Sequence, residues 1–150
     1  MRRISSLVLV ASLAAAVAEA QQPPSGAYDD GCVVTVPNRQ DRFFGTDRLS
    51  VALQWTDTTV VFRPGGPGSI LSDGSLSMKF GWLRNVRGTL AIDGRRLDAP
   101  AEPLRASIPT GYGDMGFQAT ALIFPTPGCW EVTGRIADET VTFVVRVVKR

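Results

Sequence analysis

The first chemical feature of this chain is the absence of histidine from its 150 residues. Without imidazole there is no Ser–His–Asp or Cys–His constellation and no histidine-bound metal. Paired carboxylates could still hydrolyse glycosides. The acidic residues of the mature chain, however, are expected to lie mostly at turns, where Asp side chains hydrogen-bond to nearby backbone; among them are Asp57, Asp73, Asp93 and Asp138. We therefore predict no catalytic residues, no cofactor and no metal site, and a carboxylate-based hydrolase is the last of three functional alternatives.

The two cysteines, Cys32 and Cys129, are expected to form a disulfide in an oxidising compartment. By the chain-entropy model, a bridge that closes a loop of about 97 residues (129 minus 32) stabilises a fold by about 4–5 kcal/mol. Two alternatives are a reactive thiol pair and a copper(I) site that includes Met78 or Met115. The first lacks a Cys-x-x-Cys spacing. The second is disfavoured because Met78 belongs to an apolar strand face.

A glycine-rich stretch, Gly111–Gly116, matches the G-x-G-x-x-G pattern of dinucleotide-binding proteins. That mechanism needs a strand before the glycines and a helix after them to hold the pyrophosphate. Here Ile108-Pro109-Thr110 precedes the glycines and a strand that starts at Phe117 follows them. We therefore interpret the stretch as a loop, in which Tyr112 and Asp114 are the best candidates for contact with a ligand.

Five arginines fall close together in the sequence; they are Arg84, Arg87, Arg95, Arg96 and Arg105. They surround Asp93-Gly94, a dipeptide that strongly predicts a two-residue β-hairpin turn. Acidic neighbours offset part of their charge, so we expect a solvated mixed-charge sheet edge, with an anion site as the alternative. The weak binding candidates are Arg63, Arg95 and Arg96, together with Tyr112 and Asp114.

An alternation of apolar and polar residues, the period of a β-strand, recurs along the chain. It is clearest in Thr140–Val148, where every second residue from Val141 to Val147 is apolar. The pattern predicts roughly eight to ten strands, enough for two packed sheets. They are Cys32–Val36, Arg48–Trp55, Thr59–Arg63 as its hairpin partner, Ser75–Trp82, Gly88–Ile92, Arg95–Asp98, Leu104–Ile108, Phe117–Phe124, Trp130–Ile136 and Thr140–Val148. Pro37–Asp47 and Arg63–Gly68 are expected loops, and Trp55, Trp82 and Trp130 are expected core residues.

One corner between these strands, FPTPGCWEV from Phe124 to Val132, resembles the E–F corner of immunoglobulin-like sandwiches. In that corner an aromatic residue packs at the start of the penultimate strand. By this resemblance Trp130 stands at the place of the corner tyrosine, and Val132 where antibody domains carry their second cysteine. The chain is also similar to exported bacterial proteins with a single such domain. The resemblance implies an all-β, immunoglobulin-like antiparallel β-sandwich and no specific activity.

Residues 1–20 have the features of a cleaved secretory signal peptide. Arg2 and Arg3 give a positive start, Leu7–Ala18 is apolar but shorter than a membrane span, and Ala18-Glu19-Ala20 offers a cleavage site. We expect a flexible leader at 21–30 and one domain at 31–150. Cleavage leaves a net charge of about +1, which is too small to favour nucleic acid or a membrane surface.

These observations predict a monomeric protein that is exported to the periplasm or the extracellular space and has no stable membrane insertion. Its expected role is non-enzymatic, as an envelope or secreted module that binds an unidentified protein or polysaccharide or stabilises an assembly. The first alternative is a carbohydrate-binding module that uses exposed loop aromatics. We expect any ligand surface on loops at one end of the sandwich, including Arg63–Ser69 and Pro109–Gly116.

Overall fold

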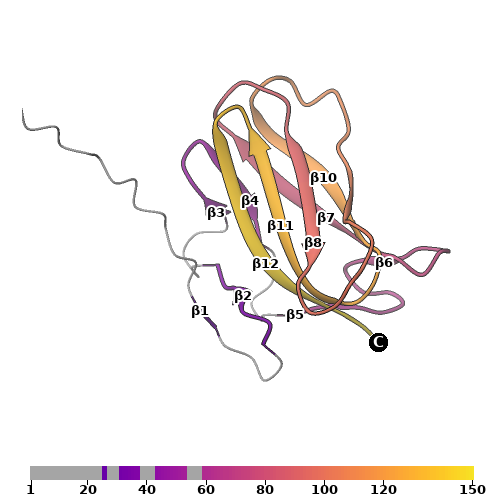
Figure 1. Ribbon diagram of the computed structural model, residues 1–150. Helices are drawn as coiled ribbons and strands as arrows, with labels where there is room; N and C mark the ends of the chain where they lie inside the picture. The colour runs from indigo at the N-terminus through magenta and orange to yellow at the C-terminus, as the bar shows by residue number, and fades with distance from the viewer. Residues whose placement is uncertain (1–24, 27–30, 38–42, 54–58) are drawn as a thin grey trace, which may run out of the picture.

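The computed structural model describes residues 25–26, 31–37, 43–53 and 59–150, and within them the chain forms β-strands and no helix. Two sheets pack face to face, which confirms the predicted all-β sandwich (Figure 1). The strands are β1 (Ser25–Gly26), β2 (Val34–Thr35), β3 (Phe43–Gly45), β4 (Leu49–Ala52), β5 (Thr59–Phe62), β6 (Ser69–Ile70), β7 (Leu76–Arg84), β8 (Ala91–Arg96), β9 (Arg105–Ser107), β10 (Gly116–Phe124), β11 (Gly128–Ile136) and β12 (Glu139–Lys149).

The first sheet has the strand order β3-β4-β7-β10-β9, with β6 paired to the start of β7. Its centre is the long antiparallel pair β7 and β10, in which Trp82 lies opposite Gln118 and Arg84 opposite Gly116. Every second residue of β7 from Leu76 to Arg84 is buried, as is every second residue of β10 from Gln118 to Phe124. These residues face the second sheet because successive strand side chains point to opposite sides.

The second sheet has the strand order β5-β12-β11-β8, in which β5 runs parallel to β12 and the other pairs are antiparallel. Figure 1 shows β12, β11 and β8 in one layer and β7 and β10 in the other. The predicted inner face of β12, Val141, Phe143, Val145 and Val147, is buried.

The strand register shows which turns and loops lie together at each end of the sandwich. The hairpin end carries the β11–β12 turn at Ala137 and Asp138, the β3–β4 turn, and the loop 109–115 that leads into β10. The corner end carries the β10–β11 corner, the loop 63–68 after β5 and the turn before β7. At the hairpin end Arg48 joins the two sheets through ion pairs with Asp138 (3.1 Å) and Glu139 (2.9 Å).

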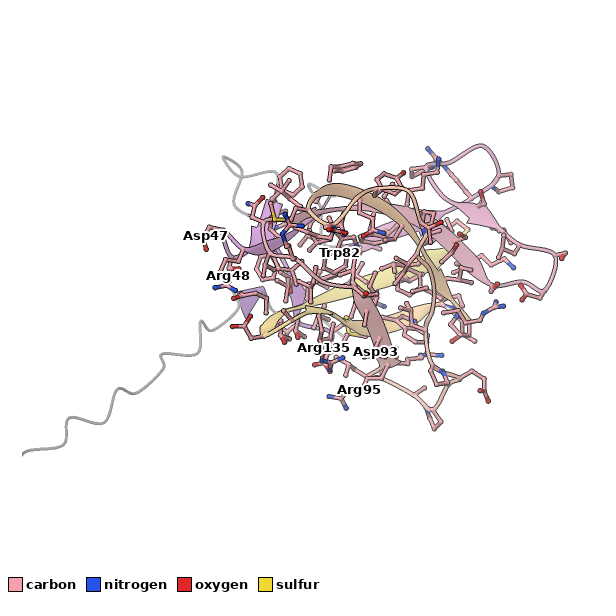
Figure 2. All side chains as sticks on the ribbon, turned by 90° about the horizontal axis from the view of Figure 1, so that it is seen from above. Asp47, Arg48, Trp82, Asp93, Arg95 and Arg135 are labelled. Atoms are coloured by element: carbon pink, nitrogen blue, oxygen red, sulfur yellow. A yellow bond between two sulfur atoms is a disulfide. The ribbon has the colours of Figure 1, made fainter. Side chains whose placement is uncertain are left out.

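Trp82 lies at the centre of the core, between the two layers (Figure 2). Its ring centroid is 6.4 Å from that of Phe143, and its Nε1 donates a hydrogen bond to Thr120 Oγ1 at 3.2 Å. Gly134 on β11 makes room for the indole, because a Cβ there would lie 2.4 Å from two ring carbons. Trp82 and Trp130 are fully buried, as predicted, whereas Trp55 lies outside the described residues.

Trp130 fixes the β10–β11 corner. Its ring packs edge-on against Phe124, with centroids 5.7 Å apart, and its Nε1 donates to the carbonyl oxygen of Thr126 at 3.0 Å. A hydrogen bond from the aromatic residue back to backbone a few residues upstream is the function of the corner tyrosine in immunoglobulin domains.

The predicted disulfide joins Cys32 to Cys129, with Cα atoms 5.6 Å apart. Cys129 points to the opposite face of β11 from Trp130, so the bridge attaches the β2 segment to the outside of the second sheet. Val34 and Val144 pack beside the two sulfurs as a small separate apolar cluster. The backbone N–H of Val144 also donates to Thr35 Oγ1 at 2.9 Å.

The predicted hairpin turn at Asp93-Gly94 is wrong. Both residues lie inside the continuous strand β8, where Asp93 pairs with Thr133 and Gly94 with Val132. Gly94 has no positive φ, the conformation that such a turn requires. Its missing side chain instead permits a close approach, because a Cβ there would lie 2.8 Å from Leu104 Cβ.

The predicted hairpin between Arg48–Trp55 and Thr59–Arg63 is also wrong. β4 pairs with β7 in one sheet, and β5 pairs in parallel with β12 in the other. Alternation identifies strands but does not choose their neighbours, and β5 binds the part of β12 from Arg146 to Lys149.

Three smaller differences concern the first third of the chain and the number of strands. Ser25–Gly26 pairs with β2, although 21–30 was predicted as a leader. Phe43–Gly45 forms β3 within the predicted loop 37–47 because it pairs with β4. The described residues contain twelve strands, more than the eight to ten predicted, and β1, β3 and β6 are among those missed.

Candidate functional site

The loop 109–115 at the hairpin end is the segment with the most unusual backbone. Gly111, Gly113 and Gly116 all adopt positive φ (93°, 68° and 88°), a region that glycine enters without steric cost. The loop leads into β10 and forms no helix, so it lacks the βαβ context of a dinucleotide site.

Three large apolar side chains are exposed on or beside this loop. Tyr112 is 38% exposed, Met115 49% and Phe117 53%. The Tyr112 and Phe117 ring centroids are 6.5 Å apart, with the ring planes at 66°. The Phe117 ring lies over Gly81 on the outer face of the first sheet, where a Cβ would be 2.5 Å from it.

Arg84 lies directly beneath the loop and is only 3% exposed. Its Nη2 donates to the carbonyl oxygens of Tyr112 (3.3 Å) and Gly113 (3.1 Å). Its buried Nε has no hydrogen-bond partner in the part of the chain that the structure describes.

Gln118 lies on the same inner face, diagonally across the β7–β10 pair from Arg84. It is 6% exposed, and its Nε2 donates to the carbonyl oxygen of Pro109 at 3.0 Å. A carbonyl oxygen can only accept, so the amide nitrogen must face Pro109 and Oε1 must point elsewhere. Among the described residues Oε1 has no partner.

The residues predicted from the sequence as weak binding candidates do not form one site. Tyr112 and Asp114 lie in the loop at the hairpin end, and Asp114 pairs with Arg87 at 2.9 Å. Arg63 lies at the corner end, directly after β5. The prediction that loops 63–69 and 109–116 share one end is therefore wrong, because β5 ends beside the last residues of β12, whereas β10 begins at the opposite end.

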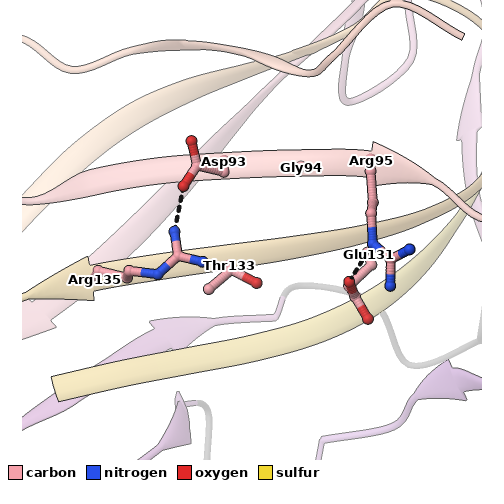
Figure 3. A pocket seen from close by; sticks show the side chains of 6 residues that line it. All are labelled: Asp93, Gly94, Arg95, Glu131, Thr133 and Arg135. Carbon is pink, nitrogen blue, oxygen red and sulfur yellow. Dashed lines mark hydrogen bonds and ion pairs between the residues drawn. The ribbon is translucent and has the colours of Figure 1, made fainter.

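Arg95 lines a shallow hollow of about 180 Å³ on the outer face of the second sheet. It pairs across the strands with Glu131 (2.8 Å), and Arg135 pairs with Asp93, so Thr133 lies between two ion pairs (Figure 3). Figure 2 shows Asp93, Arg95 and Arg135 together on one outer side of the molecule. Exposed ion pairs of this kind contribute little to stability, and the two charges of each pair neutralise each other.

Arg96 lies at the corner end and contacts several residues there. Its guanidinium lies against Gly128, donates to Asp98 at 2.7 Å and reaches Thr126 Oγ1 at 3.2 Å. The hydrogen bond from Arg96, together with one from the backbone N–H of Cys129, lowers the pKa of Asp98. The predicted mixed-charge edge is thus spread over several surfaces, and Arg84 is an error in that prediction because it is buried.

Most carboxylates in the described part of the chain are paired with arginine. Of the described carboxylates, Asp47 and Glu102 have no such ion pair. The paired carboxylates are Asp73, Asp93, Asp98, Asp114, Glu131, Asp138 and Glu139. Within the same residues no three metal-ligating side chains gather in one place.

Arg84, Gln118 and Phe117 were not among the binding residues predicted from the sequence. The signal for the first two was present, because Arg84 continues the buried phase of Leu76 to Trp82 and Gln118 shares the phase of Leu122. No signal in the sequence identified the exposure of Phe117.

Comparisons of the chain with protein-family models, with curated proteins and with solved structures found no significant match. The described residues include no helix that is long and apolar enough to cross a membrane.

Proposed function

We propose that the protein is a non-enzymatic binding module whose ligand surface is the hairpin end of the sandwich. The observation that carries this proposal is the group of exposed apolar side chains Tyr112, Met115 and Phe117. Large apolar groups that gather in one exposed place are typical of interaction sites. Loops held on a rigid scaffold are also the usual position for binding residues.

The interior of the protein holds this surface in a defined shape. Arg84 and Gln118 bind three carbonyl oxygens of the loop 109–115 from below, and Arg87 pairs with Asp114 from outside. A preorganised loop loses less conformational entropy on binding than a free one. This arrangement supports a role in recognition.

We propose further that the sandwich is immunoglobulin-like and that the protein works outside the cytoplasm. The strand orders β4-β7-β10-β9 and β12-β11-β8 correspond to the A-B-E-D and G-F-C sheets of immunoglobulin domains, and the Trp130–Thr126 hydrogen bond supports the corner assignment. The Cys32–Cys129 disulfide supports an oxidising compartment.

Polysaccharide is the second candidate partner, and the exposed Tyr112–Phe117 pair favours it. Sugar rings stack on aromatic faces. Because the ring planes of Tyr112 and Phe117 meet at 66°, a sugar ring would stack on one of them at a time and not on both as a flat platform. The described tryptophans, Trp82 and Trp130, are buried and take no part.

The test is binding of the purified oxidised protein to partners isolated from the envelope fraction, and to immobilised polysaccharides, with matched variants. Phe117→Ser and Tyr112→Ser should each weaken binding about tenfold, equal to about 1.4 kcal/mol. Leu97→Ser is the control, because Leu97 is also exposed (43%) but follows β8 toward the corner end. Equal binding by wild type and both loop variants, or loss of binding only in Leu97→Ser, would place the surface elsewhere.

A further inference from the structure

We propose that Arg84 and Gln118 form a binding site for an oxyanion, a carboxylate or phosphate with a hydroxyl or N–H donor beside it. The site lies under the loop 109–115. The inference deepens the proposed function by naming the ligand chemistry, and it rests on that function only in placing recognition at the hairpin end.

Arg84 is a buried cation. The residue as a whole is only 3% exposed, although its side chain carries a positive charge. No carboxylate in the described residues lies within ion-pair distance of it, although Arg48, Arg87, Arg95, Arg96, Arg105 and Arg135 all have one. Burial of a cation without an opposite charge is costly, because neutral carbonyl oxygens replace only part of its hydration.

The unused hydrogen-bonding capacity of Arg84 lies on one edge of its guanidinium. Nε and Nη2 form the edge of arginine that binds a carboxylate or phosphate with two parallel hydrogen bonds. In this structure Nη2 contacts two loop carbonyls, and Nε contacts none of the described acceptors. An oxyanion brings a full negative charge and two acceptor oxygens, which the carbonyls lack, so it would compete well with them for this edge.

The amide of Gln118 supplies the opposite kind of group, a hydrogen-bond acceptor without a partner among the described residues. Its Oε1 is a buried acceptor, and it projects from the neighbouring strand on the same inner face. A ligand that presents an oxyanion to Arg84 and a donor to Gln118 would satisfy both atoms together. Uronic acids, with a hydroxyl next to the carboxylate, and the C-terminal carboxylate of a peptide, with its own N–H, both have this chemistry.

The loop provides the means of entry. At Gly111, Gly113 and Gly116 nothing lies within 4 Å of where a Cβ would be, so the loop has open space on that side. The described attachments of the loop include the bonds from Arg84 and Gln118 to its carbonyl oxygens, the exposed Arg87–Asp114 pair and the Tyr112–Phe117 ring contact. An oxyanion would replace the carbonyl oxygens of Tyr112 and Gly113 on Arg84, while the other attachments continue to hold the loop.

The experiment measures the Tm of the purified oxidised protein in galacturonate, N-acetylglycine, inorganic phosphate or acetate, each against sodium chloride at equal ionic strength. A probe at about ten times its Kd raises the folding equilibrium constant about 11-fold, a Tm rise of roughly 5 °C. We expect a rise with galacturonate, N-acetylglycine or phosphate and a smaller one with acetate, which has no neighbouring donor. The first two probes separate a sugar source from a peptide source.

Gln118→Glu is the decisive variant because it supplies a carboxylate beside Arg84 from within the chain. It loses the hydrogen bond to Pro109 but gains an ion pair with Arg84, so it should fold with a stability close to that of wild type and lose the anion-dependent rise in Tm. Arg84→Lys, which keeps the charge but loses the two-bond edge, should lose most of the rise. Arg135→Gln, an exposed arginine on the outer face of the second sheet that does not contact the loop, should keep it.

No rise in wild type up to about 50 mM of any probe would overturn the proposal, because a bridging water would then satisfy both atoms. A rise that persists in Gln118→Glu, or disappears in Arg135→Gln, would also overturn it, since the anion would be bound elsewhere. Either failure leaves the effect of Phe117→Ser on partner binding unchanged, so the two proposals fail separately.

Discussion

Charged side chains in this protein are fixed by short local networks, and Asp73 in the turn before β7 is the clearest example. It accepts hydrogen bonds from the hydroxyl and the backbone N–H of Ser75, and it pairs with Arg105 at 3.0 Å. These bonds favour the ionised carboxylate, most of all the one from the Ser75 hydroxyl. They lower the pKa of Asp73 from 3.8 to about 2.

Ser75→Ala should raise the pKa of Asp73 toward its ordinary value, as measured by NMR titration of the carboxyl carbon. Because the folded-state pKa is depressed, ionised Asp73 adds stability at pH above about 4, and this contribution is lost as the pH falls toward about 2. The variant should therefore lose stability relative to wild type near neutral pH and become similar to it at the lowest pH. An unchanged pKa in Ser75→Ala would contradict this assignment, and Ser72→Ala is the control.

Ala137 is the one described non-glycine residue with positive φ (51°), at the first of the two turn residues between β11 and β12. That position normally carries glycine in two-residue hairpins, because a Cβ is strained there. Ala137→Gly should stabilise the protein by about 0.5–1 kcal/mol in urea unfolding, after the entropy cost of glycine is subtracted. Ala101→Gly, at an exposed position without positive φ, should instead lose a few tenths of a kcal/mol. A loss at both positions would show that Ala137 is not strained.

Strands are the elements that the sequence predicts well here, and their pairing is what it does not predict. Alternation located β7, β10, β11 and β12 to within a few residues, since each buries one face along its whole length. It failed at Asp93 and Gly94, where the local turn signal was outweighed by pairing with β11 and contact with Leu104. It also could not place β5, whose partner β12 is more than eighty positions away.

The candidate site was predicted only in part, for a related reason. Tyr112 and Asp114 were found because glycines and prolines mark exposed loops. Arg84 was placed on the solvated edge because arginine is rarely buried, although its position in the period of two indicates the inner face. At Arg84 the residue type predicted exposure and the strand alternation predicted burial, and the alternation was right. A buried polar residue that continues an apolar phase is a signal worth following in other sandwiches.

The two sheets approach each other closely where Gly134 of β11 packs against the indole of Trp82 on β7. Gly134→Ala should destabilise the protein by about 1–3 kcal/mol, because the added methyl overlaps ring carbons that have nowhere to move. Trp82→Phe removes the overlapping carbons, so the double variant should be more stable than the sum of the two single effects predicts, by about 1 kcal/mol. Additive effects in urea unfolding would show that the methyl is accommodated by backbone movement instead.

At the scale of the whole molecule, the described residues form a sandwich and a short N-terminal pair, β1 and β2, attached to its outside. The described contacts that hold this pair are the Cys32–Cys129 bridge, the bond from Val144 to Thr35, and a small cluster around Val34. The main core contains none of these residues. Loss of the bridge should therefore act on the attachment of β1 and β2 in the native state and on chain entropy in the unfolded state.

In the double variant Cys32→Ala with Cys129→Ala, the free energy of unfolding should be about 4–5 kcal/mol lower than in wild type. The reason is that the unfolded chain between the two positions is no longer closed into a loop. Hydrogen exchange should show where the native state changes. Amides of β1 and β2 and of Val144 should lose protection, whereas those of β7, β10 and the centre of β11 should keep the slow exchange of a closed core, since their ladders do not involve the N-terminal pair. Uniform loss of protection across both sheets would mean that the bridge is needed for the sandwich itself. Unchanged exchange in β2 would mean that Thr35 and Val34 hold the pair without it.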